Sequence, residues 1–272
     1  MSIETTQSRP RRISFTGSGQ AGWTATIMWK QLSSILFLCA AVPLILIGLT
    51  IILPDMGFGS LGFHGHRRAS ADRNSAIATL RVLAQVEAQA LELLVRDSDM
   101  DGVGEYATIA ELAGATEIRT TCGLGNARLD VPLLSPSFRG LTEAGCSPRQ
   151  GYLFRVFLAA ERVEDRIPGL PNSPDGGFPR GGPFPGADNG EKHWCAFAWP
   201  IDRNSLSTQA FFLDERGVLL ETENADLRYA GDFAGPDFDA ALSSTQPGDM
   251  RSPLAINGTL SNDGRNWTVV GR

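Results

Sequence analysis

The chain has 272 residues with a formal net charge of −6, and 42% of the residues are apolar. This length suffices for one ordinary globular domain with appendages. The acidic balance argues against nucleic acid as a partner, because phosphate binding needs clustered Lys and Arg.

The first two predicted segments are a polar tail and a membrane span. Residues 1–32 are polar and are predicted to be a disordered cytoplasmic tail. The run SSILFLCAAVPLILIGLTIIL, Ser33 to Leu53, carries no formal charge, and its roughly 20 residues match the hydrocarbon core of a bilayer. A signal peptide would have a shorter apolar core and a small-residue cleavage site. We therefore predict a transmembrane helix over residues 33–54, with the lipid bilayer as a partner.

The flanking charges predict the orientation of this span. Arg9, Arg11, Arg12 and Lys30 precede it, against the single acid Glu4. Positively charged flanks stay in the cytoplasm. The protein is therefore predicted to cross the inner (cytoplasmic) membrane once, with a cytoplasmic amino terminus and a periplasmic or extracellular carboxy-terminal domain.

A stalk and a helix are expected next. Residues 55–68 are rich in glycine, which raises the entropic cost of helix formation, so they predict a flexible stalk. From residue 69 a helix of about 25 residues is expected, because apolar side chains recur at helical spacing. These apolar positions are Ala76, Leu80, Leu83, Ala90 and Leu94. A short helix, TIAELAG, should end at Gly114.

Beyond residue 150 the pattern changes to strands. Aromatic and branched residues alternate there, as is typical of strands. The predicted strands lie in 151–160, in 193–201, in the hairpin 208–222 and as a further pair in 254–271. Residues 161–192 are so rich in Pro and Gly that a long exposed loop is expected between the first two strands.

The order of elements predicts an α+β fold. In it, a transmembrane helix and a glycine-rich stalk precede a long amphipathic helix packed on an antiparallel β-sheet. The folded domain is expected to span residues 69–272.

Several blocks carry a family resemblance. They are RNSAIATLRVLAQVEAQAL, RDSDMDGVGEYATIAELAG, GYLFRVFLAA, KHWCAFAWPID and QAFFLDERGVLLETENADLRYAG. In this order, over about residues 70–240, they resemble type IV pilin-like and type II secretion pseudopilin-like proteins of planctomycete-type bacteria. The resemblance implies a pilin-like fold in an extracytoplasmic compartment.

Two functions follow as expectations. The resemblance implies a membrane-anchored, pilin-like structural or interaction protein, a minor component of a pilus or secretion apparatus with other pilin-like subunits as partners. The chain, however, has no recognisable prepilin cleavage motif before Ser33, and its apolar span holds no glutamate. The alternative is a stand-alone periplasmic binding or sensing module that does not assemble into filaments.

One acidic loop is the candidate metal site. The sequence DSDMDGVGE, from residue 97, matches the first half of a calcium-binding D-x-D-x-D-G loop. Its twelfth position is Thr108, which cannot supply a bidentate carboxylate, although Glu111 lies nearby. The competing interpretation is a solvated acidic turn. The predicted ligands of a structural calcium ion are Asp97, Asp99, Asp101, Val103 and Glu105.

Cysteine and histidine patterns complete the candidate sites. Cys122 and Cys146 bracket a loop-rich stretch, and a disulfide between them is predicted in an oxidising compartment. Cys195 remains an alternative partner for either. The three histidines do not form a catalytic set, and the chain carries no common nucleophile, zinc-protease or phosphate-loop motif. We therefore expect a protein that is not an enzyme.

Overall fold

The structure is a computed structural model that describes residues 60–118, 128–173, 184–226 and 228–271. The predicted tail and transmembrane span lie outside these residues. Within the described ranges, every helix is too short or too polar to cross a bilayer.

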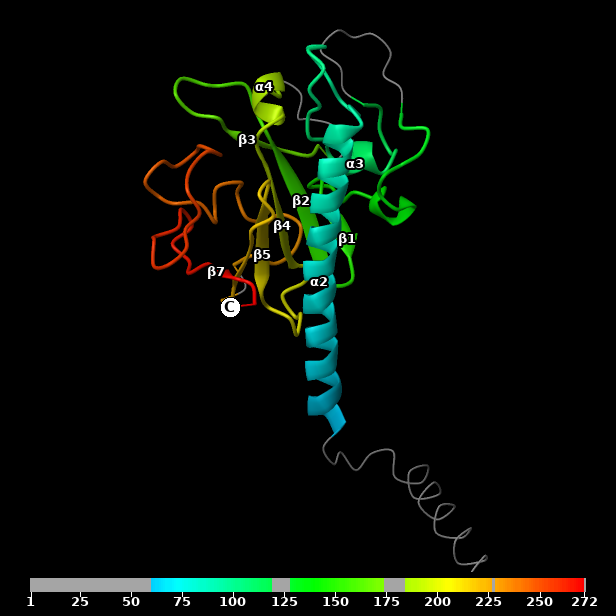
Figure 1. The fold of residues 1–272 in the computed structure, drawn as a ribbon. Coiled ribbons are helices and arrows are strands. Elements are labelled where there is room, and N and C mark those ends of the chain that lie inside the picture. Colours follow the sequence, from blue (N-terminus) through cyan, green and yellow to red (C-terminus); the bar gives the residue numbers. More distant parts are fainter. Residues whose placement is uncertain (1–59, 119–127, 174–183, 227, 272) are drawn as a thin grey trace, which may run out of the picture. The chain divides into compact units, whose positions relative to one another are not determined.

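One antiparallel sheet organises the described chain (Figure 1). Its strand order is β1-β2-β4-β5-β6-β7, and β3 pairs with β2 beside this path. The strands are β1 (Ser147–Arg149), β2 (Tyr152–Ala159), β3 (Gly169–Pro171), β4 (Trp194–Pro200), β5 (Ala210–Asp214), β6 (Leu219–Thr222) and β7 (Thr268–Val269).

The central strands are buried on both faces. All seven residues of β4 are buried. Because successive side chains of a strand point to opposite faces, Trp194 and Ala196 enter one core cluster, whereas Cys195 and Phe197 enter the other. The sheet is therefore the middle layer of three.

The first face is covered by α2 (Ser60–Glu92) and the short α3 (Ile109–Leu112). Among the side chains of α2 that the structure describes, residues 68–92, the buried apolar ones lie between Ala76 and Ala90, and Thr79 and Glu87 are buried among them. Residues 68–75 are all exposed or half-buried. The amino-terminal part of α2 thus projects beyond the sheet, as Figure 1 shows.

The second face is covered by the carboxy-terminal segment, residues 229–267, which has little regular structure. Its apolar side chains pack against Phe197 and Phe212 of the central strands, and the Trp267 ring lies 6.0 Å from that of Phe197. Figure 1 shows this orange-to-red segment on the side of the sheet opposite α2.

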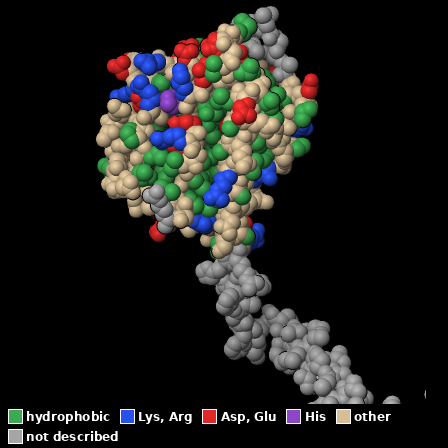
Figure 2. All heavy atoms as spheres, in the orientation of Figure 1, with side chains coloured by type: hydrophobic (Ala, Val, Ile, Leu, Met, Phe, Trp, Pro, Cys, Tyr) green, Lys and Arg blue, Asp and Glu red, His purple; other side chains and the backbone are tan. Residues whose placement is uncertain are grey.

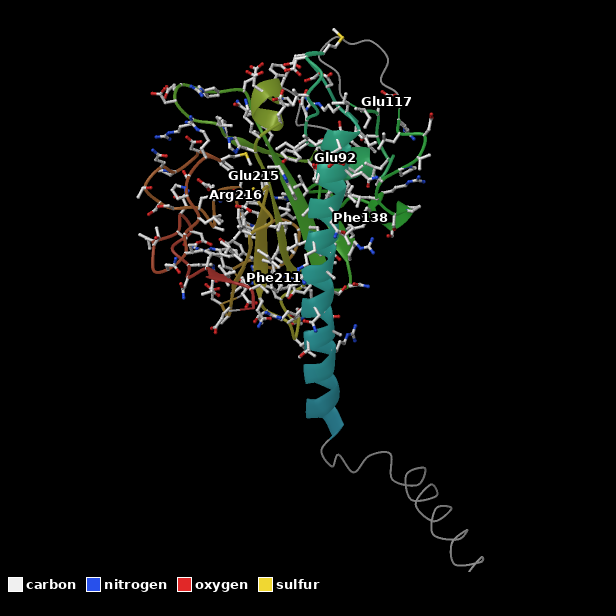
Figure 3. All side chains as sticks on the ribbon, viewed as in Figure 1. Glu92, Glu117, Phe138, Phe211, Glu215 and Arg216 are labelled. Carbon is white, nitrogen blue, oxygen red and sulfur yellow. The ribbon has the colours of Figure 1, made fainter. Side chains whose placement is uncertain are left out.

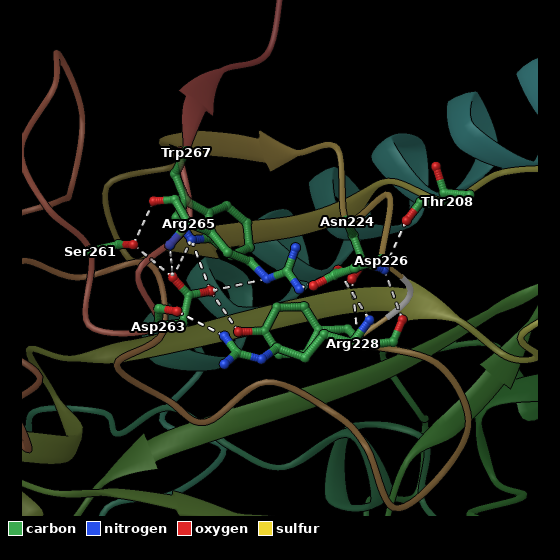
Figure 4. Close-up of polar contacts among 9 residues, drawn as sticks. Thr208, Asn224, Asp226, Arg228, Ser261, Asp263, Arg265 and Trp267 are labelled. Atoms are coloured by element: carbon green, nitrogen blue, oxygen red, sulfur yellow. Dashed lines mark hydrogen bonds and ion pairs between the residues drawn. The ribbon is translucent and has the colours of Figure 1, made fainter.

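Asp263 closes the carboxy-terminal segment through a hydrogen-bond network (Figure 4). Its carboxylate accepts from the Tyr229 hydroxyl at 2.5 Å, the Ser261 hydroxyl at 2.6 Å and the Arg265 backbone N–H at 2.9 Å. The Trp267 indole N–H donates to both carboxylate oxygens at 3.3 Å. Burial, followed by the Asp263 carboxylate, raises the pKa of Tyr229 well above its usual range, so its hydroxyl remains a donor.

Asn224 fixes the start of the same segment. Its side-chain amide donates to the carbonyls of Thr208 at 2.9 Å and Tyr229 at 2.8 Å, and its oxygen accepts from the Tyr229 N–H at 3.0 Å (Figure 4). Asn224 adopts φ +46°, a left-handed conformation that asparagine tolerates better than most residues.

The predicted fold class is wrong in its helical part. Residues 60–68 of the predicted stalk belong to α2, because each glycine costs a helix only about 1 kcal/mol, and residues 55–59 lie outside the described residues. The predicted 25-residue helix beginning at residue 69 does not match α2, whose buried face occupies only its second half. Within the described residues, the fold is an antiparallel sheet with few helices and extensive irregular structure.

The strand predictions are confirmed for the central strands and wrong near the carboxyl end of the chain. The strands expected in 151–160, 193–201 and 208–222 are present as β2, β4, β5 and β6. The pair expected in 254–271 is not formed: only β7 lies there, and it pairs with β6. The loop expected over 161–192 contains β3 and α4 (Ala187–Gly190).

Candidate metal centre

The acidic loop is held at the carboxyl end of α2 by its own closure. The backbone N–H of Glu105 donates to the carbonyl of Arg96 at 2.8 Å, which brings the two ends of the loop together. The two side chains also form an ion pair in which Arg96 is 3% exposed and Glu105 fully buried. The residues between them therefore form a closed loop whose two ends are held together.

Hydrogen bonds within the acidic loop orient two of its aspartates. The Asp97 carboxylate accepts from the backbone N–H groups of Asp101 at 3.2 Å and Gly102 at 3.1 Å. The Asp101 carboxylate accepts from the Val103 N–H at 2.8 Å. Gly102 has φ +89°, a conformation that glycine adopts without steric cost.

Two groups of carboxylates converge at this loop. One oxygen each from Asp97, Asp99 and Asp101 lie within 4.8 Å of one another, and so do oxygens from Asp99, Asp188 and Glu191. Asp99 belongs to both groups. Figure 2 shows several acidic side chains gathered at the upper end of the face that it draws.

The electrostatics of the second group follow from its like charges. Burial raises the pKa of Glu191, and the neighbouring carboxylates of Asp101, Asp99 and Asp188 raise it further. Because like charges disfavour ionisation, a divalent cation bound among these groups would relieve the repulsion.

Short helix α4 supplies the two acids that sequence reasoning missed. Asp188 lies in this helix and Glu191 directly follows it. The Tyr106 N–H donates to the Gly190 carbonyl at 2.9 Å, which joins the helix to the acidic loop. The acids fall within the predicted long loop, and no spacing relates them to the aspartates that lie about ninety residues earlier.

Glu105, a predicted calcium ligand, is buried beneath the acidic loop's backbone partners Arg96 and Ser98. Its carboxylate accepts hydrogen bonds from the Ser98 backbone N–H at 2.7 Å and from the Ser98 hydroxyl, and pairs with Arg96. Burial of this carboxylate is compensated by these partners. Glu105 therefore stabilises the loop through Ser98 and Arg96, and the Val103 N–H donates to Asp101.

Thr108 and Glu111 are also accounted for locally. Thr108 is the N-cap of α3, and the two residues form a reciprocal capping box. The Glu111 carboxylate accepts from the Thr108 N–H at 2.8 Å. These residues shape the start of α3.

The cysteines and the described histidine belong to neither of the two carboxylate groups. Cys146 and Cys195 are both buried and form no disulfide within the described residues, and Cys122, the predicted partner of Cys146, lies outside them. Burial is the first cause that raises the pKa of Cys146 to about 11. The Nδ1 atom of His193 lies 3.7 Å from a carboxylate oxygen of Glu215. The side chains of His64 and His66 lie outside the described set.

The acidic loop suits a hard divalent cation. Carboxylate oxygens are the ligands that Ca²⁺ and Mg²⁺ prefer, and Asp97, Asp99 and Asp101 could hold such an ion at the exposed side of the loop. Asp188 and Glu191 could add oxygens from a second chain segment.

Comparison of the chain with models of known protein families gives no match. Comparisons with curated proteins and with solved structures give none either.

Proposed function

We propose that this protein is a membrane-anchored structural or interaction protein. The observation that carries the proposal is the projecting amino-terminal part of α2. Residues 60–75 would span about 24 Å at the helical rise per residue. The side chains described there, those of residues 68–75, are not part of the buried core. Only residues 55–59 separate this helix from the predicted membrane span, so a stiff stem would present the sheet domain to partners.

The use of charged side chains supports a non-enzymatic role. The buried carboxylate of Asp214 accepts from the side chain of Arg216 and from the Val218 N–H. Asp249 is bound in the same way by Arg251. These carboxylates, like that of Asp263, are occupied by structural partners, which favours a supporting role over proton transfer.

We place the protein as a minor component of a pilus or secretion apparatus, with other pilin-like subunits as partners. The alternative is a stand-alone periplasmic binding module. Cation binding by the acidic loop of the isolated chain would favour this alternative.

Purification of the full chain from native membranes separates these two functions. A filament or secretion component is expected to co-purify with other pilin-like subunits, and mass spectrometry should show a shortened amino terminus. A monomer or small oligomer with an intact amino terminus would contradict assembly and favour the stand-alone module. Recovery of the chain in the soluble fraction would contradict membrane anchoring itself.

We further propose that the acidic loop binds calcium as a structural ion. Calcium at a hundredfold excess over its dissociation constant should raise the melting temperature of the full chain by roughly 5–10 °C relative to EDTA. Asp99→Asn should reduce this shift more than Asp188→Asn, because Asp99 belongs to both carboxylate groups. Acidification should weaken binding, since the raised pKa of Glu191 makes its carboxylate protonate early.

Glu117→Gln is the matched control for the calcium experiment. Glu117 is exposed and lies outside both carboxylate groups. This variant should keep the full calcium shift. An equal loss of the shift in Glu117→Gln and Asp99→Asn, or no shift in the parent chain, would show that the loop is only a solvated acidic turn.

A further inference from the structure

A pocket of about 310 Å³ lies at one end of the sheet. The ends of β4 and β5 form one wall, and the carboxy-terminal segment from Leu242 to Leu254 forms the other. Figure 3 shows Glu215 and Arg216 at this end of the sheet, with Phe211 further along the same strand. The pocket is at the lower end of the volumes typical of small-molecule sites.

The floor of the pocket is apolar. It is formed by Phe212 of β5 together with Leu242, Met250 and Leu254 of the carboxy-terminal segment. Phe212 is 1% exposed, Leu242 5% and Met250 8%, so the floor is part of the second core cluster. A ligand body in contact with it would have to be apolar and short.

Two guanidinium groups lie at the rim. Arg216 binds the buried Asp214 through Nε at 2.8 Å and Nη2 at 2.6 Å. Arg251 binds the buried Asp249 in the same way, at 3.0 Å and 2.6 Å. Each arginine is therefore fixed by its own carboxylate. Within the described part of the chain, its Nη1 donors make no hydrogen bond and are available to a ligand.

His193 and Cys195 are also among the residues that line this pocket, and the Cys195 thiol donates to the Phe238 carbonyl at 3.5 Å. The Nδ1 atom of His193 is buried and has no hydrogen-bond partner among the described residues. Cys195 lies two residues further along and is 3% exposed. Burial, followed by the carboxylates of Glu215 and Asp214, raises the pKa of the Cys195 thiol. The thiol therefore remains neutral, which suits a wall of a binding site better than a nucleophile.

We infer that this pocket binds a small monocarboxylate with a short apolar body. The apolar part would lie on the floor formed by Phe212 and Met250. The carboxylate would accept hydrogen bonds from the spare donors of Arg216 and Arg251, since a guanidinium binds carboxylates in preference to neutral groups. Asp214 and Asp249 each balance the charge of one of these arginines, and Glu215 lies 3.7 Å from His193 and 3.9 Å from Arg216. The ligand would therefore be held by the Nη1 donors themselves and not by an excess of positive charge at the rim.

Thiol protection tests this inference on the full chain in lipid nanodiscs. Alkylation of Cys195 in the reduced chain, at alkaline pH where part of the thiol is ionised, is followed by peptide mass spectrometry, with hexanoate as the probe and Cys146 as the internal control. At ten times its dissociation constant, hexanoate should slow modification of Cys195 by about tenfold, with a smaller effect on Cys146. No protection of Cys195 at millimolar hexanoate, or equal protection of both cysteines, would overturn the site.

The matched alcohol and a pocket-filling variant complete the test. 1-Hexanol, which lacks the charged group, should bind roughly tenfold more weakly than hexanoate. Leu242→Phe should abolish protection by filling the pocket, whereas Leu206→Phe, at an exposed position outside the pocket lining, should leave it intact. Equal binding of the alcohol would refute the anionic head, and full protection in a folded Leu242→Phe would refute the location.

Discussion

Replacement of Asp263 by alanine is expected to destabilise the sheet domain by about 3–5 kcal/mol, because it removes the acceptor shared by four donors. The Asp263 side chain is 7% exposed. Without it, the hydroxyl of Tyr229 and the indole N–H of Trp267 would be left in a buried region. Urea unfolding followed by tryptophan fluorescence measures the loss.

Asp237→Ala is the matched control for Asp263→Ala. Asp237 is an exposed acid of the same segment, so its replacement should change the free energy of unfolding by less than about 0.5 kcal/mol. Tyr229→Phe, alone and together with Asp263→Ala, gives the coupling between the two side chains. Additive losses, or an Asp263→Ala variant as stable as the control, would show that the network does not close the segment.

Glu105→Gln is expected to cost about 3–5 kcal/mol, because it removes the charge that balances a buried guanidinium. Arg96 is 3% exposed, and the two side chains connect the ends of the acidic loop. The loss should appear in EDTA, since Glu105 acts through Arg96 and Ser98 rather than through an ion. Chemical unfolding with and without calcium measures it.

A double replacement separates the charge pair from its surroundings. Arg96→Met combined with Glu105→Leu should cost less than the sum of the single changes, because neither variant side chain leaves a buried charge behind. The exposed Glu117→Gln should have almost no effect. If Glu105→Gln lost stability only when calcium is present, Glu105 would instead be a ligand of the ion.

Local pattern was sufficient for the central strands and for part of the acidic site. The runs that became β2, β4, β5 and β6 are dense in aromatic and branched residues bounded by turn residues, a signal contained in a few consecutive positions. Asp97, Asp99 and Asp101 converge for the same reason, since alternate residues ending in Gly102 form one turn.

Only the tertiary structure decided what covers the sheet and what completes the acidic site. The second face is packed by an irregular segment that has no periodicity to reveal it. A backbone hydrogen bond between Tyr106 and Gly190 brings Asp188 and Glu191 close to Asp99. The Glu105 side chain is buried because it pairs with the buried Arg96. A strand or a turn arises from neighbouring residues, whereas these pairings depend on which distant segments the packed core brings together.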